Sequence, residues 1–164
     1  MLDQKALQRL YRYGFSLTRD EDAAYDLLQD ALEISLRKAP DNTAAVMRYI
    51  QRIMRNRFID QYRHDHRHPT VSFNDNDNQP VNIDPQVLED IVIAEHEVES
   101  IMTMLEPLEH ELLFFWAVEG YTAQEIADRI DSTRGTVLSR IHRLRQKILR
   151  YQASGEVGVK GGAE

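Results

Sequence analysis

Residues 122–151 constrain the fold of this 164-residue chain more than any other stretch, because they predict two helices joined by a tight turn. Thr122 and Glu125 have the spacing of a capping box, in which each side chain bonds the other residue's backbone amide at the start of a helix. Residues 131–133 then interrupt the apolar pattern, and Thr133 is a favourable cap for the next helix. The stretch therefore predicts a helix-turn-helix.

The second of these two helices combines an apolar seam with a cationic outer face. At about 100° per residue, one narrow stripe holds Val137, Ile141, Leu144 and Ile148. The opposite side holds Thr136, Ser139, Arg140, Arg143, Lys147 and Arg150. A solvated surface helix is the alternative, but such a face normally mixes charge signs, whereas residues 133–151 contain six basic residues and no acidic one. The pattern favours a helix that enters the major groove of DNA.

The net charge of −7 is unevenly distributed along the chain. Residues 44–69 carry a net charge of +4 and residues 133–151 carry +6, which leaves −17 for the remainder. This distribution predicts two localised anion-binding surfaces in an acidic protein. The absence of cysteine excludes disulfides and thiolate zinc sites. We expect a cytoplasmic protein without membrane insertion, because the chain has neither a long apolar run nor the charge order of a signal peptide.

Residues 3–38 predict two helices with a break at residues 18–20. The second of them has an apolar surface wider than one packing seam requires. Its segment around residues 28–32 could offer an apolar patch with acidic edges to a protein partner, or could simply be buried in a helical bundle. The residues alone leave these two interpretations open.

Residues 44–68 predict a third helix in which aromatic residues alternate with arginines. Arginine beside aromatic side chains suits the phosphates and unstacked bases of single-stranded nucleic acid, although core aromatics with a solvated arginine face would give the same pattern. His64 and His68 would share one helical face, yet no further ligand completes a metal site near them. We therefore expect neither a metal nor another cofactor.

The remaining segments divide the chain into two modules. Residues 1–68 form the first predicted domain and residues 91–152 the second. Residues 69–90 read as an acidic, proline-containing, flexible linker, and residues 153–164 as a disordered tail. The predicted fold class is all-α, with two small helical domains of which the second is a helix-turn-helix.

Three segments of the chain resemble bacterial sigma factors of the extracytoplasmic-function type. The segment DAAYDLLQDALEISLRK is similar to the family's polymerase-binding helix, and YIQRIMRNRFIDQYRHDHR to its promoter-melting and −10 recognition helix. The segment LEPLEHELLFFWAVEGYTAQEIADRIDSTRGTVLSRIHRLRQKIL is similar to its −35-binding domain. The chain departs from the family at Asp131 and Ser132, where a glycine turn is usual, and at Glu111, where arginine is frequent.

The resemblance implies a subunit that binds core RNA polymerase and promoter DNA, under the control of an anti-sigma factor, and that has no enzymatic activity of its own. It assigns polymerase binding to Leu27, Leu28, Gln29 and Asp30. It assigns the opened −10 strand to Arg52, Arg55, Asn56, Arg57, Asp60, Gln61, Arg63 and His64. It assigns the −35 duplex to Arg134, Thr136, Ser139, Arg140, Arg143 and Lys147. Two alternatives remain: a stand-alone helix-turn-helix regulator, and a sigma-mimicking protein that sequesters an anti-sigma factor.

Overall fold

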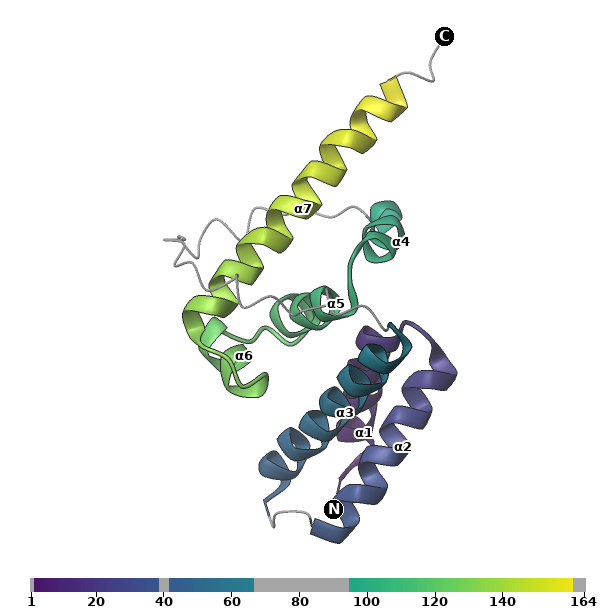
Figure 1. Ribbon diagram of the computed structural model, residues 1–164, viewed down its shortest axis with the longest axis vertical. Helices are drawn as coiled ribbons and strands as arrows, with labels where there is room; N and C mark the ends of the chain where they lie inside the picture. Colours follow the sequence, from purple (N-terminus) through teal and green to yellow (C-terminus); the bar gives the residue numbers. More distant parts are fainter. Residues whose placement is uncertain (1, 39–41, 67–94, 161–164) are drawn as a thin grey trace.

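The computed structural model describes residues 2–38, 42–66 and 95–160, and all regular secondary structure in these ranges is helical. The elements are α1 (Gln4–Thr18), α2 (Glu21–Lys38), α3 (Thr43–Asp65), α4 (Glu95–Met104), α5 (Pro107–Leu113), the π-helical turn η3 (Phe114–Val118), α6 (Ala123–Arg129) and α7 (Arg134–Lys160). Figure 1 shows α1–α3 as one bundle and α4–α7 as a second group. The all-α prediction is confirmed, whereas the predicted linker, residues 69–90, falls outside the described residues.

Polar caps set the boundaries of the first three helices. The Asp3 side chain accepts the amide of Ala6 at the start of α1, and Asn42 does the same for α3. The predicted break between the first two helices is also present. It is made by Arg19, whose φ of 53° ends α1 in the left-handed region, and by Asp20, which caps α2.

The core of the first bundle depends on a close helix crossing at Gly14. A Cβ added there would lie 2.9 Å from the Met54 side chain and 3.3 Å from the Ala24 carbonyl oxygen. Glycine therefore lets α1 approach both α2 and α3. The buried apolar residues around this crossing are Leu10, Leu17, Ala24, Leu28, Ala31, Ile50 and Met54.

The second group of helices packs on the predicted seam of α7. Val137, Ile141, Leu144 and Ile148 are all buried, so the 3.6-residue period correctly identified the inner face of this helix. The two groups share an apolar contact, because the fully buried ring of Tyr13 on α1 stacks on Phe115 at a centroid distance of 5.2 Å. The apolar core is thus continuous from one group to the other.

Two segments differ from the sequence prediction. The apolar run of residues 112–118 predicts a fully buried helix, but its last residue, Val118, is 64% exposed. The wider π-helical turn shifts the apolar register there, and Gly120 follows with a left-handed φ of 67°. Residues 153–160, predicted as part of a disordered tail, continue α7, which no proline interrupts. None of the described helices is long and apolar enough to cross a membrane.

Candidate nucleic-acid interface

The turn before α7 presents the start of this helix to solvent. Asp131 takes a φ of 52°, which closes the turn, and the Thr133 hydroxyl accepts the amide of Thr136 at 3.2 Å. The capping box of the preceding helix is also formed, because Thr122 and Glu125 exchange the two predicted bonds. The predicted helix-turn-helix geometry is therefore present in detail.

The predicted −35 residues do not all face outwards. Arg134 and Arg143 are exposed, and Thr136, Arg140 and Lys147 are partly exposed. Ser139 is 1% exposed, so its assignment to the DNA-facing surface is wrong for this conformation. α7 is packed by α6 and α5 over more of its circumference than one seam, and Ser139 lies within that wider contact.

The predicted −10 residues lie along the outer side of α3. The exposed members of the set are Arg52, Asn56, Arg57, Asp60, Gln61, Arg63 and His64. Arg55 differs from them, because only 16% of its side chain is exposed. Beyond the arginines, Phe58 stacks on Tyr62 and Tyr62 stacks on His66, which makes a row of rings along the same helix.

Two of these arginines are paired with carboxylates of the second group of helices. Arg52 forms an ion pair with Asp131, the residue that closes the turn before α7. The Arg55 Nε donates to Glu111 Oε1 at 3.1 Å, and that carboxylate is almost completely buried. The cationic face of α3 is therefore partly occupied by the protein's own acidic groups.

Glu111 is shared between three helices. It lies on α5, and besides Arg55 it accepts a 2.5 Å hydrogen bond from the phenol of Tyr13 on α1. Burial and the adjacent Glu111 carboxylate raise the pKa of Tyr13 well above its usual value, so the phenol stays protonated and donates. A buried carboxylate without such partners would be costly, and here both of its oxygens are bonded.

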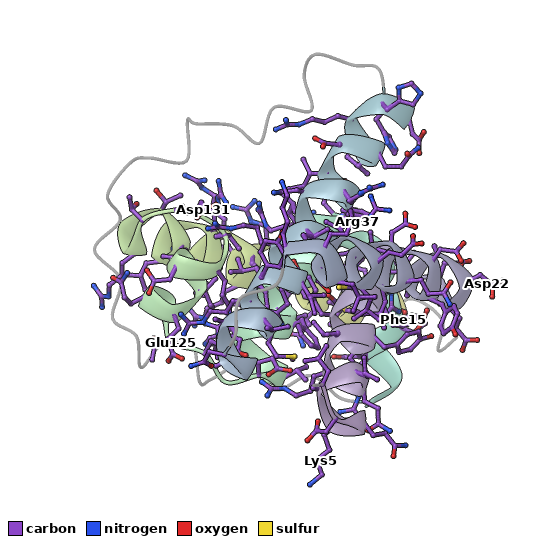
Figure 2. All side chains as sticks on the ribbon, turned by 90° about the horizontal axis from the view of Figure 1, so that it is seen from below. Lys5, Phe15, Asp22, Arg37, Glu125 and Asp131 are labelled. Carbon is purple, nitrogen blue, oxygen red and sulfur yellow. The ribbon has the colours of Figure 1, made fainter. Side chains whose placement is uncertain are left out.

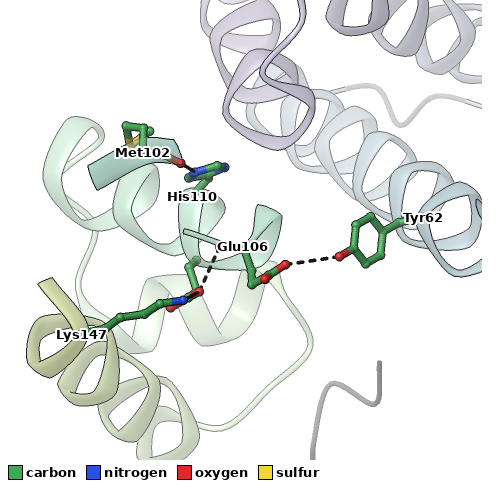
Figure 3. Close-up of polar contacts among 6 residues, drawn as sticks. Tyr62, Met102, Glu106, His110 and Lys147 are labelled. Carbon is green, nitrogen blue, oxygen red and sulfur yellow. Dashed lines mark hydrogen bonds and ion pairs between the residues drawn. The ribbon is translucent and has the colours of Figure 1, made fainter. Parts of the chain in front are cut away.

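A cavity of about 430 Å³ separates the two cationic helices. α3 contributes Arg55, Phe58 and Tyr62 to its wall, and α7 contributes Arg140 and Arg143. Figure 3 shows two polar contacts near this cavity: the Tyr62 hydroxyl donates to Glu106 at 3.3 Å, and Lys147 on α7 bonds Glu109 on α5 at 2.7 Å. The two predicted DNA-binding surfaces are thus neighbours in this arrangement.

The predicted polymerase-binding residues lie on α2, but one of them is a core residue. Gln29 and Asp30 are exposed and Leu27 is partly buried, whereas Leu28 is only 6% exposed. Leu28 is therefore part of the bundle core and its assignment to a docking surface is wrong. The exposed apolar residues of this helix are instead Tyr25 and Leu36, at 55% and 84% exposure, with Leu32 between them on the same face.

The residues that join the two groups were missing from the sequence prediction. Tyr13 was not recognised as a core residue, although it continues the spacing from Leu10 to Leu17. Glu111 was noticed only as a departure from the family. A lone carboxylate next to the run LLFFW is, however, a signal of a buried charge that needs partners. Within the described ranges, no group of three metal-ligating side chains occurs, and His68 lies outside those ranges.

Comparison with known proteins places this geometry in one class. The family described as Sigma-70 region 2 matches residues 2–68, and the family described as Sigma-70, region 4 matches residues 95–148. A similar fold occurs in the sigma factor RpoE of Bartonella quintana, solved in complex with the anti-sigma factor NepR. That structure shares 23% identity and a TM-score of 0.60 over 89% of this chain and 91% of that one.

The fold and the two matched regions define a promoter-recognition subunit of bacterial RNA polymerase. The two matched regions together cover most of the chain, which therefore belongs to the sigma-70 family. As a sigma factor it binds RNA polymerase and directs promoter recognition.

Proposed function

We propose that the outer side of α3 holds the opened −10 strand. The arginines would neutralise phosphates. The rings of Phe58 and Tyr62, which now line the cavity facing the second group of helices, would offer faces for unstacked bases together with His66 once that group moves away. The supporting observation is that Asn56, Arg57, Asp60, Gln61, Arg63 and His64 are all exposed on this one helix. Arg52 and Arg55 join this set once their carboxylate partners leave.

The first turns of α7 would read the −35 duplex. Arg134 and Thr136 lie at its N-terminal end, and Arg140 and Arg143 follow one and two turns later. Arginine can make bidentate bonds to guanine in the major groove, and Lys147 near the far end would contact phosphate. The support for this assignment is the geometry of a capped, exposed helix N-terminus after a tight turn.

The outer face of α2 would dock on the polymerase. Tyr25, Gln29, Leu32 and Leu36 share this face, and Asp30 lies at its edge. Figure 2 shows Asp22, near the start of α2, on the opposite side of the molecule from Asp131. This side remains accessible while the two groups of helices are packed together. An apolar stripe with acidic flanks suits a partner surface that combines apolar and basic side chains.

The remaining assignments follow from this function. The segment boundaries proposed from the sequence, with domains at residues 1–68 and 91–152, would separate −10 from −35 recognition.

RpoE of Bartonella quintana is bound by an anti-sigma factor, and we expect a protein inhibitor of the same kind for this chain. The chain would act in the cytoplasm, where polymerase and DNA are found, and the polymerase would supply the catalysis.

Run-off transcription with purified core polymerase tests the proposal. Wild-type protein should give transcripts only from templates that carry matching −10 and −35 elements. Asn56→Ala should impair strand opening while leaving −35 duplex binding intact, and Arg134→Ala should do the reverse. If both variants lose the two activities together, the separation of roles between α3 and α7 is wrong.

A further inference from the structure

Three arginine side chains from two helices line a second cavity, which has a volume of about 340 Å³. α3 contributes Arg48 and Arg52 to its wall, and α6 contributes Arg129. The one carboxylate in this wall, Asp128, accepts a hydrogen bond from the side chain of Gln124 at 3.0 Å. The lining therefore carries more positive than negative charge, which favours an anionic ligand.

Arg129 is fixed in position but is not fully bonded. Its guanidinium lies 3.8 Å from the centroid of the Tyr121 ring, and its Nη1 donates to the Glu125 carbonyl oxygen at 3.2 Å. The Nε atom is buried, and it has no hydrogen-bond partner among the described residues. A buried donor without an acceptor is costly, and more so when it belongs to a charged group. Because Arg129 lines the cavity, an anion bound there can supply the missing acceptor.

The two arginines of α3 differ in their bonding. Arg52 is paired with Asp131, whereas Arg48 is exposed and forms no ion pair with a carboxylate of the described ranges. The two positions are four residues apart, so both side chains lie on the same face of α3. Arg48 is therefore available to a ligand at once, and Arg52 adds positive charge beside it.

The size and chemistry of the cavity fit a phosphorylated small molecule. Its volume is within the range of about 300–1,000 Å³ that is typical of small-molecule sites. Guanidinium groups bind phosphate through paired, charge-assisted hydrogen bonds. The wall also contains the ring of Tyr49 and the side chain of Gln51, and a tyrosine ring offers a face on which a nucleobase can stack.

We propose that this cavity binds the phosphoryl group of a small anionic ligand, with Arg48 and Arg129 as the principal contacts. Nucleotides and inorganic pyrophosphate share this chemistry. The site differs from the proposed strand-binding surface of α3, because Arg48 lies outside that set and Arg129 lies on α6. Only Arg52 belongs to both. The inference therefore goes beyond promoter recognition and does not depend on it.

Isothermal titration calorimetry of the full chain tests the proposal in the absence of polymerase, DNA and magnesium. The probes are inorganic pyrophosphate and GDP, and wild-type protein should bind at least one of them. Arg48→Gln, which removes a cation, and Arg129→Lys, which keeps the charge but loses the planar fork, should each raise the dissociation constant by about tenfold or more.

Arg37→Gln is the matched control, because it removes an exposed arginine of α2 that does not line the cavity. It should bind both probes as wild type does. Circular dichroism during thermal unfolding confirms that each variant is folded. Arg48 is exposed, so Arg48→Gln gives a test that does not depend on the packing of Arg129 against Tyr121.

Tyr49→Leu distinguishes the two sources of phosphate. If the ligand is a nucleotide, this variant should weaken binding of GDP and leave binding of pyrophosphate unchanged. If the ligand is an inorganic phosphate, wild type should bind pyrophosphate at least as tightly as GDP, and Tyr49→Leu should affect neither probe. Both results support the site.

Absence of binding of both probes at millimolar concentration would overturn the proposal. Binding that is unchanged in folded Arg48→Gln and Arg129→Lys would also overturn it, because the anion would then lie elsewhere. If neither probe binds but Arg129→Lys weakens binding of a single-stranded −10 oligonucleotide, the cavity holds DNA phosphate instead. None of these results depends on transcription, so failure here leaves the proposed function to the run-off assay.

Discussion

Arg57 on α3 lies 3.6 Å from the carboxylate of Asp30 on α2. The contact joins two surfaces with different proposed partners, because Arg57 belongs to the strand-binding set and Asp30 to the polymerase-docking set. Both side chains are about half exposed, so the pair is accessible to either partner. Docking of the polymerase on α2 would therefore change the charge that Arg57 presents to DNA.

Asp30→Asn tests this connection. We expect the free energy of unfolding to change by less than about 1 kcal/mol, because exposed ion pairs contribute little to stability. Binding to core polymerase should weaken, since the carboxylate lies at the edge of the proposed docking face. Glu33→Asn, which removes an exposed carboxylate from the same helix, is the control. Equal polymerase affinity of wild type and Asp30→Asn in a pull-down titration would remove Asp30 from the docking surface.

Leu28 and Leu36 should respond to substitution in opposite ways. Leu28→Ala is expected to cost about 2–5 kcal/mol of stability, because it leaves a cavity in the bundle core. Leu36→Ala should leave stability within about 0.5 kcal/mol of wild type, because the side chain is exposed. Leu36→Ala should nevertheless weaken polymerase binding. Chemical denaturation and polymerase titration of the two variants separate the core residue from the docking residue.

Arg140→Ala should reduce promoter discrimination. If Arg140 makes a bidentate contact to a base, its loss costs about 1–3 kcal/mol and relaxes specificity at one position of the −35 element. Binding measurements on a set of −35 duplexes that differ at single positions will show this pattern. A loss of equal size for every duplex would instead identify a phosphate contact.

His110 should make stability fall in mildly acidic solution. Burial lowers the pKa of His110, although its bond to the Met102 carbonyl oxygen opposes this effect. The unfolded chain then binds a proton below about pH 6.5 more readily than the folded chain does. The contribution of the neutral imidazole is fully present above that pH and is lost as the pH falls towards the lower folded pKa. His110→Gln, which keeps a donor but cannot titrate, should flatten this part of the stability profile measured by urea denaturation at a series of pH values.

Local sequence patterns predicted the parts of the fold that depend on local physics. The seam of α7, the capping box at Thr122 and Glu125 and the break at Arg19 all follow from rules that operate within a few residues. The sequence could not show how widely α7 is packed, and this is why Ser139 was placed on the wrong side. The assignment of Leu28 to a docking surface failed for a related reason. α2 has apolar residues on both its inner and its outer face, and the sequence does not show which of the two faces packs in the bundle.

Local patterns can mark Tyr13 and Glu111 as buried residues, but no local pattern shows that the two contact each other. Tyr13 and Glu111 are 98 residues apart in the chain, and neither has a partner within its own helix that would reveal its role. The site residues on α3 could be listed from composition, yet nothing in the local sequence indicates that Arg52 and Arg55 pair with carboxylates of the second group of helices. That pairing arises only when the second group of helices packs against the first.

The ion pairs that join α3 to the second group of helices, Arg52 with Asp131 and Arg55 with Glu111, have a consequence for measurements in salt. Added salt screens the attraction that keeps the halves together and also the attraction between arginines and phosphates. The first effect frees Arg52 and Arg55 for DNA, while the second weakens each protein–DNA complex. Promoter affinity should therefore decline with ionic strength less steeply than the number of phosphate-contacting cations implies, and removal of the carboxylates of region 4 should restore the steeper dependence.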